Sequence, residues 1–309
     1  FHVLRSRPNL VHFHDPELIP PCILFKLLGI KIIYDVHEDT PQQILVKHKI
    51  PKFFRKFLSW CVREMEKKSS LIFDGIVTAT PTISQNFPAS KTIEVFNYPI
   101  LQEFSQMPVS PKLSSAKPYF VYVGGINRMK GAIEMVDAIA KFDGDVTLKI
   151  AGEIKDQTLL DEVSKHPGWP HVEMMGWLER DSVVQILRGA IGGLVLLHPV
   201  QTYIDSLPIK MFEYMAAGIP IVASNFELWE EILGSSDTGI CVDPIDPNAI
   251  FMAMKELIVN PERCLQMGQN GIIATRLSFN WETQEKVLIN YYSRLGFTSR
   301  LINISPTSE

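Results

Sequence analysis

The stretch DSLPIKMFEYMAAGIPIVAS, residues 205–224, decides the fold. It predicts a short loop, a helix and a buried strand. Apolar side chains recur at helical spacing after Pro208, and the helix is expected to end at Gly218, because glycine favours a helix C-terminus and Pro220 prevents its continuation. The apolar run that follows suits a core strand. The segment is therefore one helix–strand unit of a parallel α/β fold.

The same stretch carries charges that suit a nucleotide-sugar. The N-terminus of a helix offers unpaired N–H groups and the positive end of a dipole, which favour a diphosphate, and Lys210 adds a charge there. Glu213 lies one turn further along, where a carboxylate can bind ribose hydroxyls, and Asp205 lies in the preceding loop. The alternative is an ordinary helix–strand unit with surface carboxylates, and the local pattern alone does not decide between the two.

Length and composition bound the class of protein. The 309 residues suit two domains, and 46% hydrophobic with 21% charged residues allows a sizeable core. The net charge of −4 gives no case for nucleic-acid binding. The four cysteines show neither a CxxC pair nor zinc-ligand spacing, which favours reduced thiols in a cytoplasmic protein.

Short apolar runs alternate with helical patterns along the whole chain, which predicts mostly parallel sheets with helices on both faces. The runs lie at residues 10–13, 30–34, 75–79, 92–95, 120–123, 146–150, 172–174, 193–197 and 220–223. Three prolines and four serines in residues 101–118 indicate a linker. We expect a first Rossmann-like domain over 1–105, a linker over 106–118, a second Rossmann-like domain over 119–278, a crossover helix over 279–296 and a flexible tail over 297–309.

Polar residues and glycines follow several of the predicted strands. They include His14, His37, Gly124, Gly125, Gly152, Glu153 and His198. Ligands of open α/β sheets bind outside the carboxyl ends of the strands. Two domains that each carry such an edge predict a cleft with one substrate on each side.

The segment YVGGINRMKGAIEMV, residues 122–136, reads as strand, glycine turn, basic pair and helix. Gly124 and Gly125 allow a ligand to approach the backbone closely. Arg128 and Lys130 can neutralise a diphosphate leaving group. The alternative is a solvated loop with two cations. Neither the Walker pattern nor GxGxxG is present.

These motifs resemble family 4 of the glycosyltransferases, which are retaining enzymes of the GT-B architecture. The resemblance rests on two acids, Asp205 and Glu213, separated by seven residues and followed by Gly218-Ile219-Pro220. The first acid is aspartate where the family usually has glutamate. The Arg and Lys of the family's glycine turn fall at Gly125 and Lys130, so Arg128 is a candidate substitute for the Arg.

The resemblance extends over essentially the whole chain. Gly176-Trp177-Leu178 matches the loop that contacts the base, and His37 matches a histidine near the transferred sugar. The segment FNWETQEKVLINYYSRL, residues 279–295, resembles the terminal helix that crosses back to the first domain.

The resemblance implies transfer of a sugar from a nucleotide-sugar to a glycan or lipid-linked acceptor of cell-surface polysaccharide synthesis, with retention and without metal or other cofactor. It assigns catalysis to His37, Asp205 and Glu213. The donor-binding set is Gly124, Gly125, Arg128, Lys130, Gly152, Glu153, Trp177, Leu178, Ser206, Leu207, Lys210 and Glu213. The first recognisable segment matches the middle of the family's first domain, so we expect that domain to be incomplete in this chain, which would then bind donor but transfer poorly. Two alternatives stay open: a non-catalytic donor-binding fragment and a nucleotide-sugar epimerase of the same fold.

Two further segments allow two interpretations each. Asp143-Gly144-Asp145 spells the DxD of metal-binding glycosyltransferases, but its place before a strand favours a turn. Residues 50–68 predict an amphipathic helix, and residues 44–68 hold eight basic and two acidic side chains, a local charge of 8 − 2 = +6. This helix either packs on its own sheet or docks on the inner face of the cytoplasmic membrane, where a lipid-linked acceptor would lie.

Overall fold

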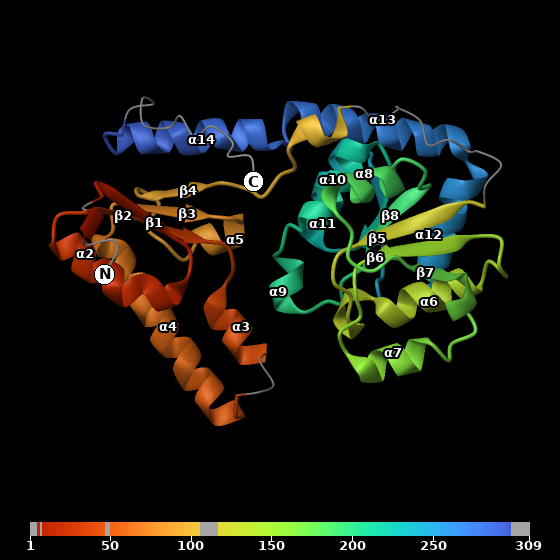
Figure 1. Ribbon diagram of the computed structural model, residues 1–309, viewed down its shortest axis with the longest axis horizontal. Helices are drawn as coiled ribbons and strands as arrows, with labels where there is room; N and C mark the ends of the chain where they lie inside the picture. The colour runs from red at the N-terminus through yellow and green to blue at the C-terminus, as the bar shows by residue number, and fades with distance from the viewer. Residues whose placement is uncertain (1–4, 7, 47–49, 106–116, 298–309) are drawn as a thin grey trace. The chain divides into compact units, whose positions relative to one another are not determined.

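The computed structural model describes residues 5–6, 8–46, 50–105 and 117–297. The chain divides into two compact units, one of residues 1–97 with 282–309 and one of residues 98–281 (Figure 1). Each unit has its own parallel sheet and its own apolar core. The fold class is therefore α/β with two parallel-sheet domains, as the alternating sequence pattern predicted.

The first unit contains a four-stranded sheet in the order β1-β2-β3-β4. The strands are β1 (Leu10–Phe13), β2 (Lys31–Val36), β3 (Gly75–Thr78) and β4 (Thr92–Glu94), and every pairing is parallel. Leu10 pairs with Lys31 and Ile33 pairs with Gly75. The register brings the carboxyl ends of β1 and β2 to the same edge of the sheet.

Helices pack on this sheet around a core that includes Phe13, Tyr34, Phe73 and Ile76. They are η1 (Pro16–Leu18), α2 (Ile19–Leu27), α3 (Thr40–Val46), α4 (Lys52–Ile72), α5 (Pro81–Ser84) and α14 (Trp281–Arg294). The Ile76 N–H donates to the Tyr291 hydroxyl of α14 at 3.2 Å, and that hydroxyl donates to the Lys91 carbonyl. Helix α14, all of it but Trp281, therefore belongs to the first unit although it ends the sequence.

The second unit contains a six-stranded parallel sheet in the order β10-β9-β8-β5-β6-β7. The strands are β5 (Tyr119–Val123), β6 (Thr147–Ala151), β7 (Val172–Met174), β8 (Gly192–Val195), β9 (Ile221–Ser224) and β10 (Gly239–Val242). The direction of winding reverses between β5 and β8. Ligands of doubly wound sheets bind at the carboxyl ends of the strands at such a switch point.

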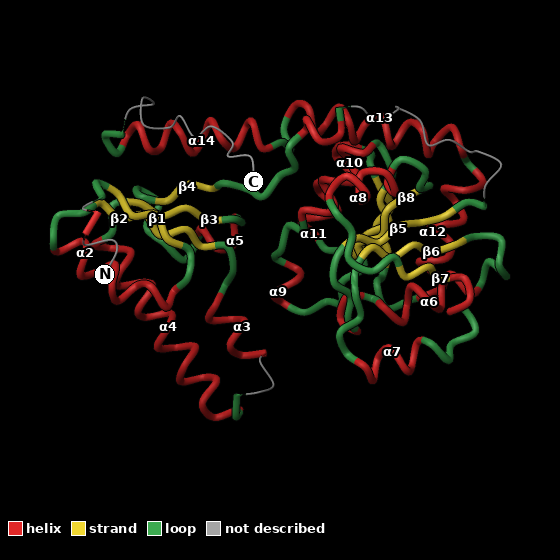
Figure 2. The backbone as a smooth tube through the Cα atoms, viewed as in Figure 1, coloured by secondary structure: helices red, strands yellow, loops and turns green. Residues whose placement is uncertain are grey.

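Two apolar clusters cover the faces of this sheet, and Figure 2 shows its strands enclosed by helices. The helices are η2 (Leu101–Phe104), η3 (Arg128–Lys130), α6 (Ala132–Ala140), α7 (Gln157–Val163), η4 (Trp169–His171), α8 (Arg180–Leu187), α9 (Gln201–Ile204), α10 (Ile209–Ala217), α11 (Glu227–Ser236), α12 (Pro247–Val259) and α13 (Pro261–Leu277). Every residue of α10 from Met211 to Ala217 is buried. Helix α10 is therefore a core helix, and a charge on it needs a partner.

The structure differs from the sequence interpretation in three places. Strand β10 was not predicted. The units divide at Asn97, before the expected boundary at 105, because Tyr98 packs on Phe212 with ring centroids 4.7 Å apart and Phe104 is buried in the second core. Helix α14 ends at Arg294. Most of the expected linker and tail, residues 106–116 and 298–309, lies outside the described residues.

The structure places the Asp143-Gly144-Asp145 segment in a turn. Asp143 and Gly144 have φ values of 49° and 90° and lie in the turn between α6 and β6, as a turn reading requires. In the part of the chain that the structure describes, no helix has both the length and the apolar character needed to cross a bilayer.

Gly193 tests the packing of this core. A Cβ there would lie 2.1 Å from the Tyr214 ring, whereas one at Gly234 of α11 would meet nothing within 4 Å. We expect Gly193→Ala to destabilise the protein by about 1–3 kcal/mol through overpacking. Gly234→Ala should be neutral or stabilising by up to about 1 kcal/mol, because alanine favours a helix. Thermal unfolding of both variants measures this, and equal melting temperatures would contradict the packing.

Candidate functional site

The backbone at the end of β5 passes close to its neighbours. Gly124 has φ 113°, and a Cβ at Gly152, after β6, would lie 2.0 Å from the Gly124 carbonyl oxygen. Only glycine fits this approach. A Cβ at Gly125 would meet nothing within 4 Å. The Gly124-Gly125 turn is therefore packed on one side and open on the other.

A tyrosine of helix α10 holds the end of the strand that leads into this turn. The Val123 N–H donates to the Tyr214 hydroxyl at 2.9 Å, and the Tyr214 ring occupies the space that Gly193 leaves free. Because Tyr214 is fully buried, its bond to the end of β5 is shielded from water. Strands β5 and β8 and helix α10 thus hold one another at the switch point.

Two lysines flank the turn. The Lys210 Nζ lies 3.8 Å from the centroid of the Tyr122 ring, and a Cβ at Gly124 would lie 3.3 Å from it. Burial, together with the charge of Lys130, lowers the pKa of Lys210 to about 7. The Lys130 Nζ donates to the Gly125 carbonyl at 3.1 Å. Two ammonium groups therefore meet one glycine turn, and a bound anion would restore full charge to Lys210.

The Glu213 carboxylate is buried, with 5% of the residue exposed. Its Oε1 accepts from Arg180 Nη1 of α8 at 2.5 Å. Arg180 Nε donates in turn to Glu103 Oε2 of η2 at 2.7 Å. Glu213 is thus buried and oriented by a cation. Sequence reasoning missed Arg180 and Glu103, because their partners lie 33 and 77 positions away along the chain.

Arg128 has a different partner from the one expected. Its Nη1 donates to Glu162 Oε1 of α7 at 3.2 Å, and Nη2 pairs with the other carboxylate oxygen. Both side chains are about half exposed. Arg128 therefore points toward α7, and it would have to leave Glu162 before it could contact a ligand at the glycine turn.

The remaining donor-side residues lie in loops at the sheet edge. Asp205 accepts from Gln201 Nε2 at 2.6 Å, and the Ser206 carbonyl accepts from Trp229 Nε1 at 2.7 Å. Leu207 and Leu178 pack on the core beside α8 and α10, Glu153 is exposed, and Trp177 is 72% exposed. The structure leaves the Trp177 indole open to a flat ligand.

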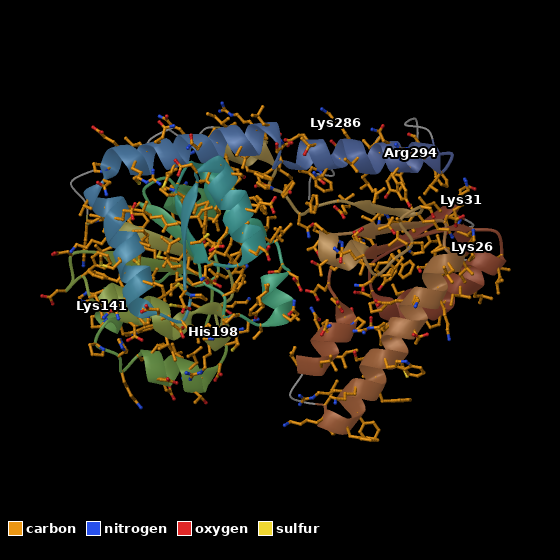
Figure 3. All side chains as sticks on the ribbon, turned by 180° about the vertical axis from the view of Figure 1, so that it is seen from behind. Lys26, Lys31, Lys141, His198, Lys286 and Arg294 are labelled. Carbon is orange, nitrogen blue, oxygen red and sulfur yellow. The ribbon has the colours of Figure 1, made fainter. Side chains whose placement is uncertain are left out.

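The sequence placed His198 at the end of a strand, but its pairing with Glu134 of α6 was not predicted. His198, after β8, has its Nε2 2.9 Å from Glu134 Oε1 of α6, and its N–H donates to the Met129 carbonyl at 2.9 Å (Figure 3). Both side chains are largely buried. The pair ties the loop after β8 to the first turn of α6.

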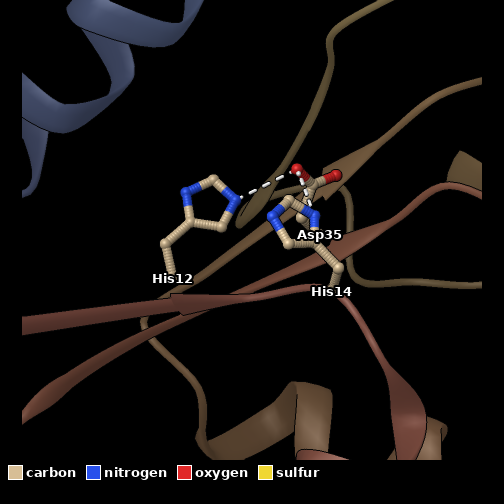
Figure 4. Close-up of side chains that lie close together, drawn as sticks. All are labelled: His12, His14 and Asp35. Atoms are coloured by element: carbon tan, nitrogen blue, oxygen red, sulfur yellow. Dashed lines mark hydrogen bonds and ion pairs between the residues drawn. The ribbon is translucent and has the colours of Figure 1, made fainter. Parts of the chain in front are cut away.

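In the first unit, three histidines surround one carboxylate at the carboxyl edge of the sheet. Asp35 Oδ2 lies 3.1 Å from His12 Nε2, 3.2 Å from His14 Nδ1 and 3.2 Å from His37 Nε2. Figure 4 shows His12 and His14 directed at Asp35. The sequence holds a signal for this cluster in HFH, residues 12–14, and DVH, residues 35–37. Alternate residues of a strand share a face, and β1 and β2 are neighbours, so the polar side chains of the two segments meet. Only His37 was singled out as a catalytic residue.

Contacts within this cluster shift the pKa values of two of its members, Asp35 and His37. Burial works against the charge of Asp35, but hydrogen bonds from His12 and His37 outweigh it and hold the pKa of this carboxyl at about 2. The hydrogen bond to Asp35 raises the pKa of His37. Among the described residues, His12, His14 and Asp35 are also the one group of three such side chains close enough to share a cation.

Known proteins share this architecture. The chain is similar to a glycogen synthase of Mycobacterium tuberculosis, with 22% identity over 290 residues, 90% of this chain and 66% of the relative, so it spans just under two thirds of that relative's length. A sucrose-phosphate synthase from Thermosynechococcus elongatus has a TM-score of 0.77 at 18% identity and covers 96% of this chain and 75% of its own. Anabaena HepE in complex with UDP has a TM-score of 0.75 at 13% identity, covering 95% and 81%.

These two parallel-sheet units define a glycosyltransferase fold of the GT-B class. A family model described as "Glycosyl transferases group 1" matches residues 104–273, which include the glycine turn, both lysines and the acid pair. The chain belongs to this family.

Lys210 predicts a pH-dependent donor affinity. With a pKa of about 7, it is protonated below neutral pH and neutral above it. Because a diphosphate favours the protonated form, nucleotide-sugar affinity should fall about tenfold from pH 6 to pH 8. Calorimetry should also detect proton uptake on binding near pH 8. Lys210→Met should bind weakly at both pH values and lose the pH dependence, while Lys130→Met should keep a pH dependence whose midpoint moves to higher pH, because the charge of Lys130 helps to lower the pKa of Lys210. The same slope in Lys210→Met as in the unmodified chain would contradict this role.

Proposed function

We propose that the protein is a retaining glycosyltransferase that moves a sugar from a nucleotide-sugar to a hydroxyl of a glycan or lipid-linked acceptor in cell-surface polysaccharide synthesis. The observation that carries the proposal is the arrangement at the switch point of the second sheet. Lys130 and Lys210 flank an open glycine turn there, and the next turn of α10 carries the buried, oriented Glu213. A diphosphate beside a ribose needs this set of groups.

The lysines supply the electrostatic part of catalysis. Departure of a nucleoside diphosphate places negative charge on its oxygens, and fixed cations stabilise that charge most in the transition state. In this proposal Lys130 and Lys210 hold the diphosphate without a metal, and Arg128 contributes only after leaving Glu162. Because Lys210 is largely desolvated, its attraction to the leaving group is strong.

Glu213 is proposed to accept hydrogen bonds from the ribose hydroxyls. Its remaining lone pairs are available for them, while the hydrogen bond from Arg180 fixes its orientation. Asp205 is proposed to contact the transferred sugar, and Trp177 and Leu178 to border the base. The HepE neighbour was solved in complex with UDP, which supports a nucleotide as part of the ligand of this fold.

The first unit is proposed to contribute His37 and to bind the acceptor. A specific feature of α4 favours a lipid-linked acceptor at the cytoplasmic face of a membrane. The N-terminal half of this helix carries an exposed aromatic patch of Phe53, Phe54, Phe57 and Trp60, of which Phe53 is 83% exposed. Lys52, Arg55 and Lys56 lie among these side chains. Exposed aromatics with basic neighbours suit the interface of an anionic bilayer.

Nucleotide binding and turnover test the donor site together. A thermal-shift panel of UDP, GDP and ADP with their sugars identifies the donor, since a ligand at 100 times its Kd adds about 2.7 kcal/mol of stability. With that donor, Glu213→Gln should lose about 1.5–3 kcal/mol of binding free energy, because it loses a charged acceptor. Glu230→Gln, an exposed change on α11, is the control.

Lys130→Ala should lower kcat more than it raises KM, and Arg128→Ala should stay near the unmodified chain.

The outcomes separate the alternatives. Unchanged nucleotide affinity in Glu213→Gln would refute the ribose assignment. Donor binding without turnover would favour a binding fragment, and an epimerised sugar formed without acceptor would favour the epimerase. Loss of turnover with EDTA, restored by a divalent cation, would refute a metal-free diphosphate site.

Vesicle binding tests the aromatic patch. The protein should sediment with vesicles of phosphatidylglycerol and much less with those of phosphatidylcholine, because its basic side chains need an anionic surface. Trp60→Ser should release it, whereas Met252→Ser on α12 should not, although Met252 is 60% exposed and Trp60 is 59% exposed. Equal sedimentation of the two variants would contradict docking through α4.

A further inference from the structure

The histidine cluster of the first unit forms one continuous chain of hydrogen bonds. The Tyr292 hydroxyl of α14 lies 2.6 Å from His12 Nδ1, and the other nitrogen of that ring lies 3.1 Å from Asp35 Oδ2. His37 Nε2 lies 3.2 Å from the same oxygen. It also lies 3.0 Å from His14 Nδ1. Each ring nitrogen of the three histidines except one therefore faces a partner.

The carboxylate fixes where the ring protons lie. Asp35 is ionised at neutral pH, and an ionised carboxylate only accepts hydrogen bonds. His12 therefore carries a proton on Nε2 and donates it to Asp35 at 3.1 Å. His14 Nδ1 and His37 Nε2 both lie 3.2 Å from the same oxygen, but the hydrogen bond that lowers the pKa of Asp35 comes from His37 and not from His14, so His37 also carries its proton on Nε2. In the neutral rings Nδ1 is then an acceptor. Tyr292 donates to the Nδ1 of His12, and Asn97 Nδ2, at 3.4 Å, is placed to donate to the Nδ1 of His37.

The same reasoning fixes His14. Two N–H groups cannot face each other at the 3.0 Å that separates His37 Nε2 from His14 Nδ1. Since the His37 nitrogen carries the proton, His14 Nδ1 accepts it. A neutral His14 then carries its proton on Nε2. The structure gives that nitrogen no partner among the described residues, and the His14 side chain is 57% exposed. Both nitrogens of His37, in contrast, are already engaged.

We propose that Asp35, His12 and Tyr292 are positioning residues that lock the tautomers of His37 and His14, so that the first unit presents the His14 Nε2–H as a donor to a hydroxyl oxygen of a sugar. This inference rests on the proposed function for its substrate class alone. His37 acts within it through His14. The charged groups around the pair are Asp35 on β2, Glu38 after it and the imidazole of His12 on β1.

The neighbouring tyrosines of α14 give a matched test. Tyr292 bonds to His12, whereas Tyr291 bonds to the backbone of Ile76 and Lys91 and stabilises the sheet. In the full chain labelled with ¹⁵N-histidine, at a pH above the raised pKa of His37, NMR should show the Nε2–H tautomer for His12, His14 and His37. Tyr292→Phe should shift His12 toward a mixture of tautomers, and Asp35→Asn should do so for His12 and His37. Tyr291→Phe should lower the melting temperature and leave the tautomers unchanged.

Kinetics with the nucleotide-sugar found by the thermal-shift panel give a second measurement. Loss of the hydrogen bond between Tyr292 and His12 should lower kcat about two- to tenfold in Tyr292→Phe, with donor KM unchanged. Tyr291→Phe should keep kcat at a temperature where it is folded. An Nδ1–H tautomer of His37 in the unmodified chain, or equal tautomer shifts in the two tyrosine variants, would overturn the proposal. So would histidine signals that change with EDTA, because the cluster would then hold a metal.

These results separate the two proposals. Absence of nucleotide-sugar binding in the unmodified chain would refute the proposed function while the tautomers still report on the positioning residues. Normal donor binding with the wrong tautomers would refute only the positioning residues.

Discussion

The close backbone packing at the end of β5 is the constraint on which the second unit depends. Gly124 and Gly152 touch through their main chains, and the Val123 N–H is held by the hydroxyl of a fully buried tyrosine of α10. The glycine turn, the switch point and the core helix are thereby fixed as one rigid part. A ligand that binds the turn meets groups that need no rearrangement, which lowers the free-energy cost of binding.

Buried charge is the second organising feature. The buried Glu213 carboxylate is paired with Arg180, and Arg180 is in turn held by Glu103. Lys210 forms no ion pair with any residue that the structure describes, and burial and Lys130 lower its pKa to about 7. Helix α10 therefore carries Glu213, which is paired with a cation, and one turn away Lys210, which is not paired with an anion. In the proposed function an incoming diphosphate would supply the missing negative charge, and donor binding would then be coupled to protonation of Lys210.

The sequence predicted the alternating architecture and most strands, because apolar runs and glycine or proline boundaries are local signals. It also predicted Lys130, Lys210 and Glu213 at one sheet edge, since a helix N-terminus and a glycine turn are readable from spacing. It did not predict Arg180 as the partner of Glu213, the Glu162 partner of Arg128, or Asp35 as the centre of three histidines. These contacts join segments far apart in the chain, and periodicity does not encode them. Strand β10 was missed because its four residues, GICV, are short and begin with glycine.

A crystal structure of the chain with its nucleotide-sugar is the most direct test of the central claim, that the glycine turn of the second unit binds a diphosphate. We predict diphosphate oxygens within about 3 Å of Lys130 Nζ and Lys210 Nζ, beside the open side of Gly125, with the ribose hydroxyls at a similar distance from the Glu213 carboxylate. A diphosphate bound away from the turn, or a ribose that leaves Glu213 paired with Arg180 alone, would contradict the account.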